Sequence, residues 1–256
     1  MDDPFPSGYL MGNLGTIIWD DGMGGRSPWF PAAALHSGSG LVISVGAVSY
    51  YDRMDNLEDR LIYRAVSGAG YAGKIIKIKA AVSQFNAFGI FYSQTGFLSV
   101  GYRGFSLEAT GYRFFVRGKE ETARTLGELG AAIWVPFKYA AVMFQAEHIV
   151  LKESRSGSDT PFLLRGSIHT KRNLFGAQGV TVVVIPSRAQ PVRFTLGEEY
   201  RLFGWLGIHA AVSANPVMIG IGVVAEWSRA GAALSFVSHP ELGWSKGFSA
   251  EYRPRL

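Results

Sequence analysis

Residues 202–227 read LFGWLGIHAAVSANPVMIGIGVVAEW, and the first charged side chain in this stretch is Glu226. An apolar run of this length could cross a membrane as a helix. Asn215 and Pro216 in its middle argue against a helix, because this pair marks a turn and proline interrupts helices. On both sides of that turn the residues alternate with period two, which is the period of a strand. One face beyond the turn carries Ile219, Ile221 and Val223, and the other carries Gly220, Gly222 and Val224. We therefore predict two antiparallel strands.

The same alternation recurs along the chain. In the last segment Trp244, Phe248 and Tyr252 share a face that only Lys246 interrupts, opposite a small and polar face. A lipid-facing band that begins and ends on aromatic residues is typical of a strand in a membrane barrel. Further alternating segments are 41–50, 61–72, 76–83, 85–93, 96–103, 105–110, 129–137, 140–147, 162–171, 178–188, 193–203 and 231–239. The prediction is an all-β protein, a single antiparallel up-and-down transmembrane β-barrel of about 12–14 strands.

Composition favours this class over a soluble β protein. Of 256 residues, 32 are Gly and only 18% are charged, whereas soluble domains carry about 25% charged residues and about 7% Gly. Several predicted faces are apolar from end to end, while the opposite faces are rich in Gly, Ala and Ser. A soluble barrel would be the reverse, with large side chains inside and polar ones outside. A soluble β-barrel remains the less favoured alternative.

Turn signals indicate a meander. Tight joins are expected at Arg103-Gly104, Phe137-Lys138, Asn215-Pro216 and Ala230-Gly231. The charged stretches 52–60, 118–125 and 152–160 are predicted to be loops, and 56–64 could form a short helix within a loop.

The chain divides into a non-strand segment, residues 1–39, and a barrel, residues 40–256. Trp19, Met23, Trp29 and Phe30 place large apolar groups in a segment with no alternation of its own. We expect this segment to fold into the lumen as a plug. Asp2 and Asp3 follow Met1 directly, so no signal peptide is visible and export to the outer membrane has to be assumed.

Residues 197–253 contain an ordered set of motifs. Gly197-Glu198-Glu199-Tyr200 opens a strand, Ala214-Asn215-Pro216 ends the next one, and Ser238-His239-Pro240-Glu241-Leu242-Gly243 precedes the last strand. This set resembles the end of the fatty-acid-transporter-like (FadL-type) outer-membrane barrels, especially their PorV/PorQ-like relatives. Gly22-Met23-Gly24-Gly25 is similar to an element near the mature N-terminus of those proteins. The resemblance implies transport of hydrophobic small molecules or an accessory role in type IX protein secretion, with secretion-system proteins as partners.

The chemistry-bearing residues give no credible active site, so we predict that the protein is not an enzyme. Without Cys there can be no disulfide and no thiolate metal site. His209, Glu226 and Ser228 could approach one another as a nucleophilic triad, but a polar lumen network, which every wide barrel needs, is the favoured explanation. The spacing of His and acidic residues suggests no metal or other cofactor. Lys and Arg are scattered rather than clustered, which argues against nucleic-acid binding despite a net charge of +5.

The lumen is therefore the candidate functional region. Its predicted titratable lining has mixed signs, which favours cross-strand ion pairs over a selectivity ring of one charge. It comprises Lys77, Lys79, Glu108, Arg165, His169, Lys171, Glu199, Arg201, His209, Glu226, Glu251 and Arg253. Two functions stay open: a transport or secretion-associated barrel, and a structural or binding barrel with a plugged lumen and no flux. From the predicted faces, Val223→Arg should destabilise the barrel, whereas Gly222→Ser should be mild.

Overall fold

The computed structural model describes residues 31–35, 40–50, 62–87, 89–116, 119–153, 162–170, 176–184, 192–215, 217–239 and 243–254. These residues form one closed barrel and a single turn of 3₁₀ helix, η1 (Ala32–Ala34). The strands are β1 (Gly40–Tyr50), β2 (Ile62–Ala72), β3 (Ile76–Ala87), β4 (Phe91–Tyr102), β5 (Phe105–Val116), β6 (Lys119–Pro136), β7 (Ala140–Glu153), β8 (Leu163–Thr170), β9 (Gly176–Val184), β10 (Arg193–Arg201), β11 (Leu206–Ala214), β12 (Met218–Glu226), β13 (Ala230–His239) and β14 (Gly243–Tyr252).

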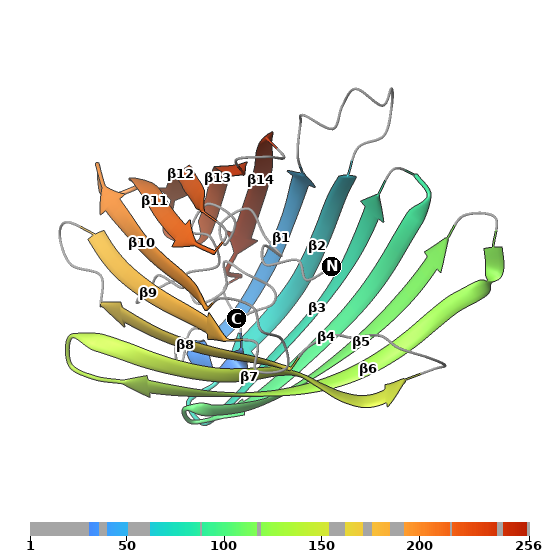
Figure 1. Ribbon diagram of the computed structural model, residues 1–256. Coiled ribbons are helices and arrows are strands. Elements are labelled where there is room, and N and C mark those ends of the chain that lie inside the picture. The colour runs from blue at the N-terminus through green and yellow to red at the C-terminus, as the bar shows by residue number, and fades with distance from the viewer. Residues whose placement is uncertain are drawn as a thin grey trace.

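Each strand pairs antiparallel with the strands before and after it in the sequence (Figure 1). The sheet closes where β1 pairs with β14, with Ile43 opposite Tyr252 and Ser49 opposite Lys246. Closure leaves no unpaired sheet edge, which is the condition for a sheet to stand in hydrocarbon. The prediction of a single up-and-down antiparallel barrel is confirmed, at the upper end of the expected strand number.

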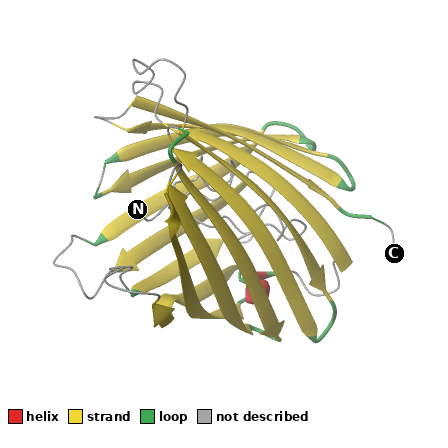
Figure 2. Ribbon diagram, turned by 90° about the vertical axis from the view of Figure 1, so that its right-hand side faces the viewer, coloured by secondary structure: helices red, strands yellow, loops and turns green. Residues whose placement is uncertain are grey.

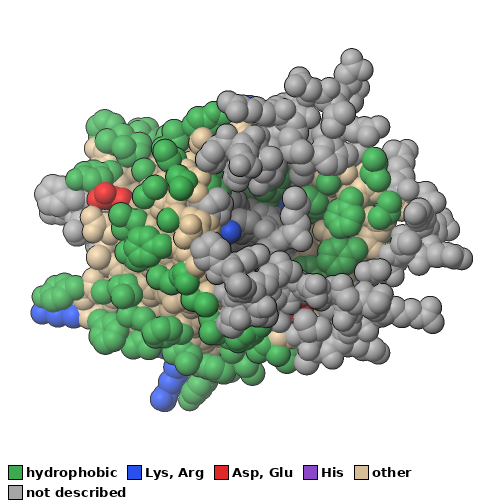
Figure 3. Space-filling view, viewed as in Figure 1, with side chains coloured by type: hydrophobic (Ala, Val, Ile, Leu, Met, Phe, Trp, Pro, Cys, Tyr) green, Lys and Arg blue, Asp and Glu red, His purple; other side chains and the backbone are tan. Residues whose placement is uncertain are grey.

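Side chains alternate between the two faces of the wall. In β14, Ser245 and Ser249 are buried, while Trp244, Phe248 and Tyr252 are 44%, 42% and 49% exposed. Large apolar side chains such as these predominate on the described part of the outer face in Figure 3. The inward positions are instead rich in Ser, Thr, Glu and small residues. The predicted assignment of outward and inward faces is therefore correct.

The two ends of the barrel differ in their connections. At one end the strands are joined through residues 73–75, 103–104, 137–139, 171–175, 202–205 and 227–229, and β1 begins and β14 ends there. We call this the short-turn end. The three longest connections, 51–61, 154–162 and 185–192, all lie at the other end, the long-loop end. Among the described residues, no helix is long and apolar enough to cross a membrane.

Several expected boundaries are wrong. Residues 85–93 are not a strand of their own, because β3 extends to Ala87 and β4 starts at Phe91. Residues 119–125, expected in a loop, belong to β6, and Lys152 belongs to β7. Charged residues near strand ends can extend beyond the apolar band, so charge alone did not mark these strand ends. The turn expected at Ala230-Gly231 lies at residues 227–229 instead.

Two of the remaining turn predictions can be compared with the backbone geometry. Arg103 and Asn215 both adopt positive φ, 54° and 58°, as the predicted tight turns require. The expected loop helix is wrong over 62–64, where the chain is already in β2, and its remainder and the loop 52–60 lie outside the described residues.

Candidate functional site in the barrel lumen

The described lumen wall combines polar and titratable side chains with small and apolar ones. Seven of the predicted titratable lining residues are buried: Lys77, Lys79, Glu108, His169, Glu199, His209 and Glu251. Arg165, Arg201, Glu226 and Arg253 are partly buried, and Lys171 lies outside the described residues. Glu128, buried on β6 and absent from the predicted lining, belongs to the same wall. Its outward neighbours Gly127 and Leu129 could have revealed it through alternation.

Part of the N-terminal segment lies against this wall. We call residues Pro31–Leu35 the strap; it contains η1, which contacts β3, β4, β5 and β6 near the short-turn end (Figure 2). The Ala32 backbone N–H donates a 2.9 Å hydrogen bond to Ser99 Oγ on β4. Lys77 Nζ on β3 donates to the carbonyl oxygen of Ala33 at 3.0 Å and also to that of Leu35.

The hydrogen bonds of Lys77 pair a buried ammonium group with backbone carbonyl oxygens of the strap. Lys77 is only 4% exposed, so its ammonium has little access to water. A buried ammonium needs oxygen partners, and a short helical turn ends in carbonyl groups that its own backbone does not satisfy. Lys77 therefore fastens the strap to the wall.

Glycine makes room for the strap. A Cβ at Gly101 would lie 3.2 Å from both the Ala32 carbonyl carbon and the Ala33 backbone nitrogen. A Cβ at Gly70 would lie 3.4 Å from Leu35 Cδ1. The strap also buries apolar surface: Ala33 and Ala34 pack with Trp134, Ala141 and Met143, and Ala32 and Leu35 pack with Ala72. The strap was part of the expected plug, and sequence alone gave no sign of its partners on β2–β7.

Elsewhere in the lumen, side chains reach across a glycine to the second strand along. Glu108 on β5 stands opposite Gly130 on β6, and its Oε2 accepts a 3.0 Å hydrogen bond from Gln145 Nε2 on β7. A Cβ at Gly130 would lie 3.0 Å from Glu108 Oε2 and 3.0 Å from the Ala146 carbonyl oxygen. The glycine thus leaves open the path that the carboxylate takes.

His209 makes the same kind of crossing. His209 on β11, Gly222 on β12 and Ser235 on β13 stand in one register row. His209 Nε2 and Ser235 Oγ are 2.9 Å apart, and both side chains are buried. A Cβ at Gly222 would lie 2.6 Å from His209 Cε1 and closer still to Nε2 and to the Leu234 carbonyl oxygen. The expectation that Gly222→Ser is mild is therefore wrong: position 222 faces the lumen as predicted, but the ring of His209 fills it.

A third crossing is ionic. Arg201 on β10 stands opposite Gly207 on β11, and its guanidinium pairs with Glu226 at the end of β12. Two further ion pairs line the lumen, Arg165 Nη2 with Glu147 Oε1 and Arg253 Nη2 with Glu251 Oε1, each at 3.3 Å. The predicted cross-strand ion pairing is correct for Arg165–Glu147, which joins adjacent strands; Arg201–Glu226 spans three strands.

The structure does not assemble the triad considered from sequence. His209 bonds to Ser235, Glu226 pairs with Arg201, and Ser228 is exposed in the turn after β12. A second His–Ser contact, His169 Nε2 to Ser167 Oγ at 2.8 Å, lies on β8 with the His169 ring 5.6 Å from that of Trp134. Within the described part of the chain, no three His, Asp or Glu side chains cluster so as to hold a metal ion. These contacts brace the wall.

The sequence matches no protein-family model, and no curated protein matches it significantly. Solved structures with a similar fold include engineered variants of a Rhodopseudomonas blastica porin. One has 12% sequence identity and a TM-score of 0.47, covering 83% of this chain and 99% of the porin chain. Another has 12% identity, the same coverages and a TM-score of 0.48. At this identity and TM-score the likeness supports no conclusion about function, and the FadL-type resemblance of residues 197–253 stays a prediction.

Proposed function

We propose that the protein is an outer-membrane β-barrel whose N-terminal segment occupies the lumen at the periplasmic end and restricts passage. The observation that carries the proposal is the inversion of the wall: large apolar side chains predominate on the outward face of a closed sheet, and most of the buried Ser, Thr, Lys and Glu side chains face inward. Water would solvate that outer face unfavourably, whereas hydrocarbon accommodates it.

The direction follows from the connections. Barrels of the bacterial outer membrane have short periplasmic turns and longer extracellular loops. The short-turn end, where β1 begins and β14 ends, would then face the periplasm. The strap lies near this end, so it would narrow the periplasmic mouth.

The strap supports the plugged alternative over free flux. It is anchored by Lys77 and Ser99, and all five of its residues are buried against the wall. A segment that merely passed the mouth would not need a buried cation to hold it. We infer a barrel whose role is binding or structural, or whose opening requires the strap to move.

Transport of hydrophobic small molecules through the lumen is the weaker candidate. Apolar residues such as Val48, Phe97 and Met143 also face inward, but buried Ser, Thr and charged side chains lie between them along the described wall, and such groups disfavour contact with an apolar molecule. No described contact favours an accessory role in protein secretion, for which the FadL-type resemblance is the support.

An engineered disulfide tests the strap directly. The chain has no Cys, and a Cβ at Gly101 would stand 3.3 Å from Ala32 Cβ, close to disulfide spacing. Ala32→Cys with Gly101→Cys should therefore cross-link in isolated membranes under mild oxidation. Ala32→Cys with Gly96→Cys is the matched control, because Gly96 is on the same strand but faces outward. Failure of the first pair to cross-link would show that the strap does not lie on β4.

Conductance then tests the function. In a planar bilayer, deletion of residues 1–37 should raise single-channel conductance. The oxidised double variant, Ala32→Cys with Gly101→Cys, should conduct no more than the full chain. If the shortened protein folds and conducts no better, the segment does not restrict passage. If it cannot fold, the segment belongs to the wall.

A further inference from the structure

The outer face of β1–β6 is hollowed. A cavity of about 780 Å³ lies along β1–β6, and one of about 680 Å³ adjoins it on β2–β5. Both volumes are in the range of ligand sites. Most of their lining residues are outward-facing, among them Ser67, Ala69, Ala80, Gly96, Ala109, Gly111 and Gly127. We call the two cavities together the outer groove.

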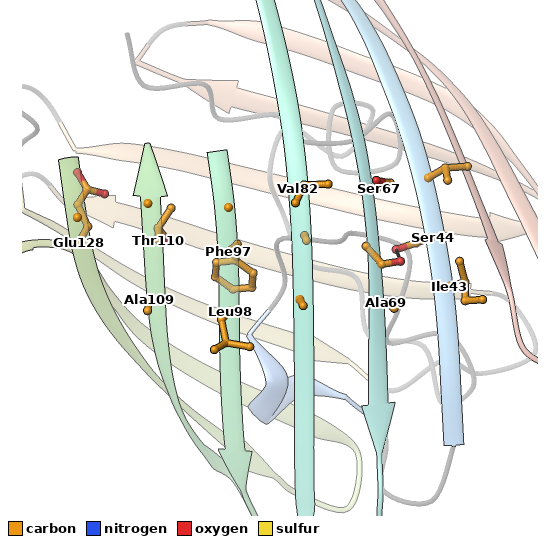
Figure 4. Close-up of a pocket in the computed structure, with 17 residues that line it drawn as sticks. Ile43, Ser44, Ser67, Ala69, Val82, Phe97, Leu98, Ala109, Thr110 and Glu128 are labelled. Atoms are coloured by element: carbon orange, nitrogen blue, oxygen red, sulfur yellow. Dashed lines mark hydrogen bonds between the residues drawn. The ribbon is translucent and has the colours of Figure 1, made fainter. Parts of the chain in front are cut away.

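Three glycines form the floor of the outer groove. Gly96, Gly111 and Gly127 face one another across β4, β5 and β6 in a single register row. A Cβ at any of them would meet nothing within 4 Å, so packing inside the wall does not require glycine there. Val82 on β3 is paired with Gly96 and continues this row, and Leu98 lies two residues from Gly96 on β4 (Figure 4). By contrast, outward positions along β12 and β13 carry large apolar residues: Ile219, Ile221, Val223, Leu234 and Phe236.

One end of the outer groove is polar. Gln84, Gln94 and Arg113 are in register on β3, β4 and β5, all face outward, and all line the smaller cavity. They lie two residues along their strands from the glycine row, toward the long-loop end. The next outward positions hold Tyr92 and Phe115, whose rings stack 5.7 Å apart.

The position of Arg113, Gln94 and Gln84 beside the aromatic residues indicates which chemical groups a bound molecule would carry. Aromatic residues mark the level at which hydrocarbon meets the headgroups. The Arg113 guanidinium lies 5.9 Å from the centre of the Phe115 ring, so a positive charge is held at that level. Two amides beside it add neutral donors. A guanidinium at this depth favours a phosphate, and the apolar floor below it favours an acyl chain.

We propose that the outer groove binds a phosphorylated membrane lipid of the leaflet at the long-loop end. Its phosphate is held by Arg113, Gln94 and Gln84, and an acyl chain lies over Gly96, Gly111 and Gly127. This site is on the outside of the wall and independent of the strap, although it rests on the proposed membrane location.

Native mass spectrometry of the full-length protein tests the proposal. Delipidated protein in detergent would be titrated with dimyristoyl phosphatidic acid and, in parallel, with dimyristoyl glycerol and with myristate. Gly111→Leu should fill the floor and weaken binding of phosphatidic acid about tenfold. Arg113→Gln should remove most of the preference for phosphatidic acid over the neutral lipid.

Gly166→Leu is the control, because Gly166 also faces outward on β8 but lies away from the groove. Every variant must first show the heat-modifiable migration of the parent protein. Loss of lipid binding through misfolding is then distinguished from loss of the binding site itself. Equal binding by Gly111→Leu and Gly166→Leu in folded barrels would overturn the proposal. It would also be overturned if Gly111→Leu left lipid binding intact and converted a dimer to a monomer, because the occupant would then be a second copy. Binding of myristate as tight as that of phosphatidic acid would overturn the phosphate assignment.

Discussion

Replacing Gly222 by alanine tests how the lumen is built. The added Cβ would lie 2.6 Å from His209 Cε1, and closer to Nε2 and to the carbonyl oxygen of Leu234. The ring of His209 could rotate away, but it would then lose its 2.9 Å contact with Ser235. The Leu234 carbonyl belongs to the paired strand β13 and cannot move without disturbing the ladder.

Two costs add in this variant. Overpacking a tight site typically costs about 1–3 kcal/mol, and leaving a buried hydroxyl without its partner adds a similar amount. We therefore expect Gly222→Ala to lower the free energy of unfolding by roughly 2–6 kcal/mol. Gly166→Ala is the matched control: its Cβ would lie 3.8 Å from Phe144, an ordinary contact, and the change should be within about 0.5 kcal/mol.

The measurement is urea-induced unfolding of the barrel refolded into phospholipid vesicles, followed by tryptophan fluorescence. The double variant His209→Ala with Gly222→Ala should recover only part of the loss, because the Leu234 carbonyl remains in place. Equal unfolding free energies for Gly222→Ala and Gly166→Ala would refute the reasoning that glycine leaves the path for His209.

Three other substitutions probe the outer face, the lumen and the strap. Val223→Arg places a charge on an outward position that is 45% exposed, and near the bilayer midplane it should lower the free energy of unfolding by roughly 2–4 kcal/mol. Val223→Leu is the control in the same unfolding assay, and equal tolerance of the two variants would show that the outward face is misassigned. Gly130→Ala should separate Glu108 from Gln145 and lower the urea midpoint of unfolding. Gly130→Ala combined with Glu108→Ala should lose less unfolding free energy than the sum of the two single changes. Additive losses would contradict the contact of Glu108 with Gln145 across Gly130. Lys77→Met should remove the hydrogen bonds to the carbonyl oxygens of Ala33 and Leu35 and so reduce the yield of the engineered cross-link between positions 32 and 101. An unchanged yield would mean that Lys77 does not hold the strap against the wall.

The barrel could be predicted from sequence because its signal is local. Period-two alternation, as in Trp244, Phe248 and Tyr252 against Ser245 and Ser249, follows directly from the strand pleat, and the structure places these faces as expected. Strand ends were predicted less well. β6 starts at Lys119 within a charged stretch, because a strand can continue beyond the apolar band without any change in its hydrogen bonding.

The lumen contacts could not be predicted, because they depend on register. Sequence places His209, Gly222 and Ser235 on inward faces, but only the pairing of β11, β12 and β13 puts them in one row. The same holds for Arg201, whose partner Glu226 lies two strands away. A glycine on an inward face is expected to be only a small lining residue, whereas Gly130 and Gly222 lie beneath side chains that cross to the next strand but one.

The most direct test of the central claim is the folding of the purified chain from urea in the presence and absence of lipid vesicles. The outward apolar face predicts a folded, heat-modifiable species that forms only with lipid or detergent and remains with the vesicles after alkaline carbonate extraction. A folded, soluble monomer in lipid-free buffer would contradict the account.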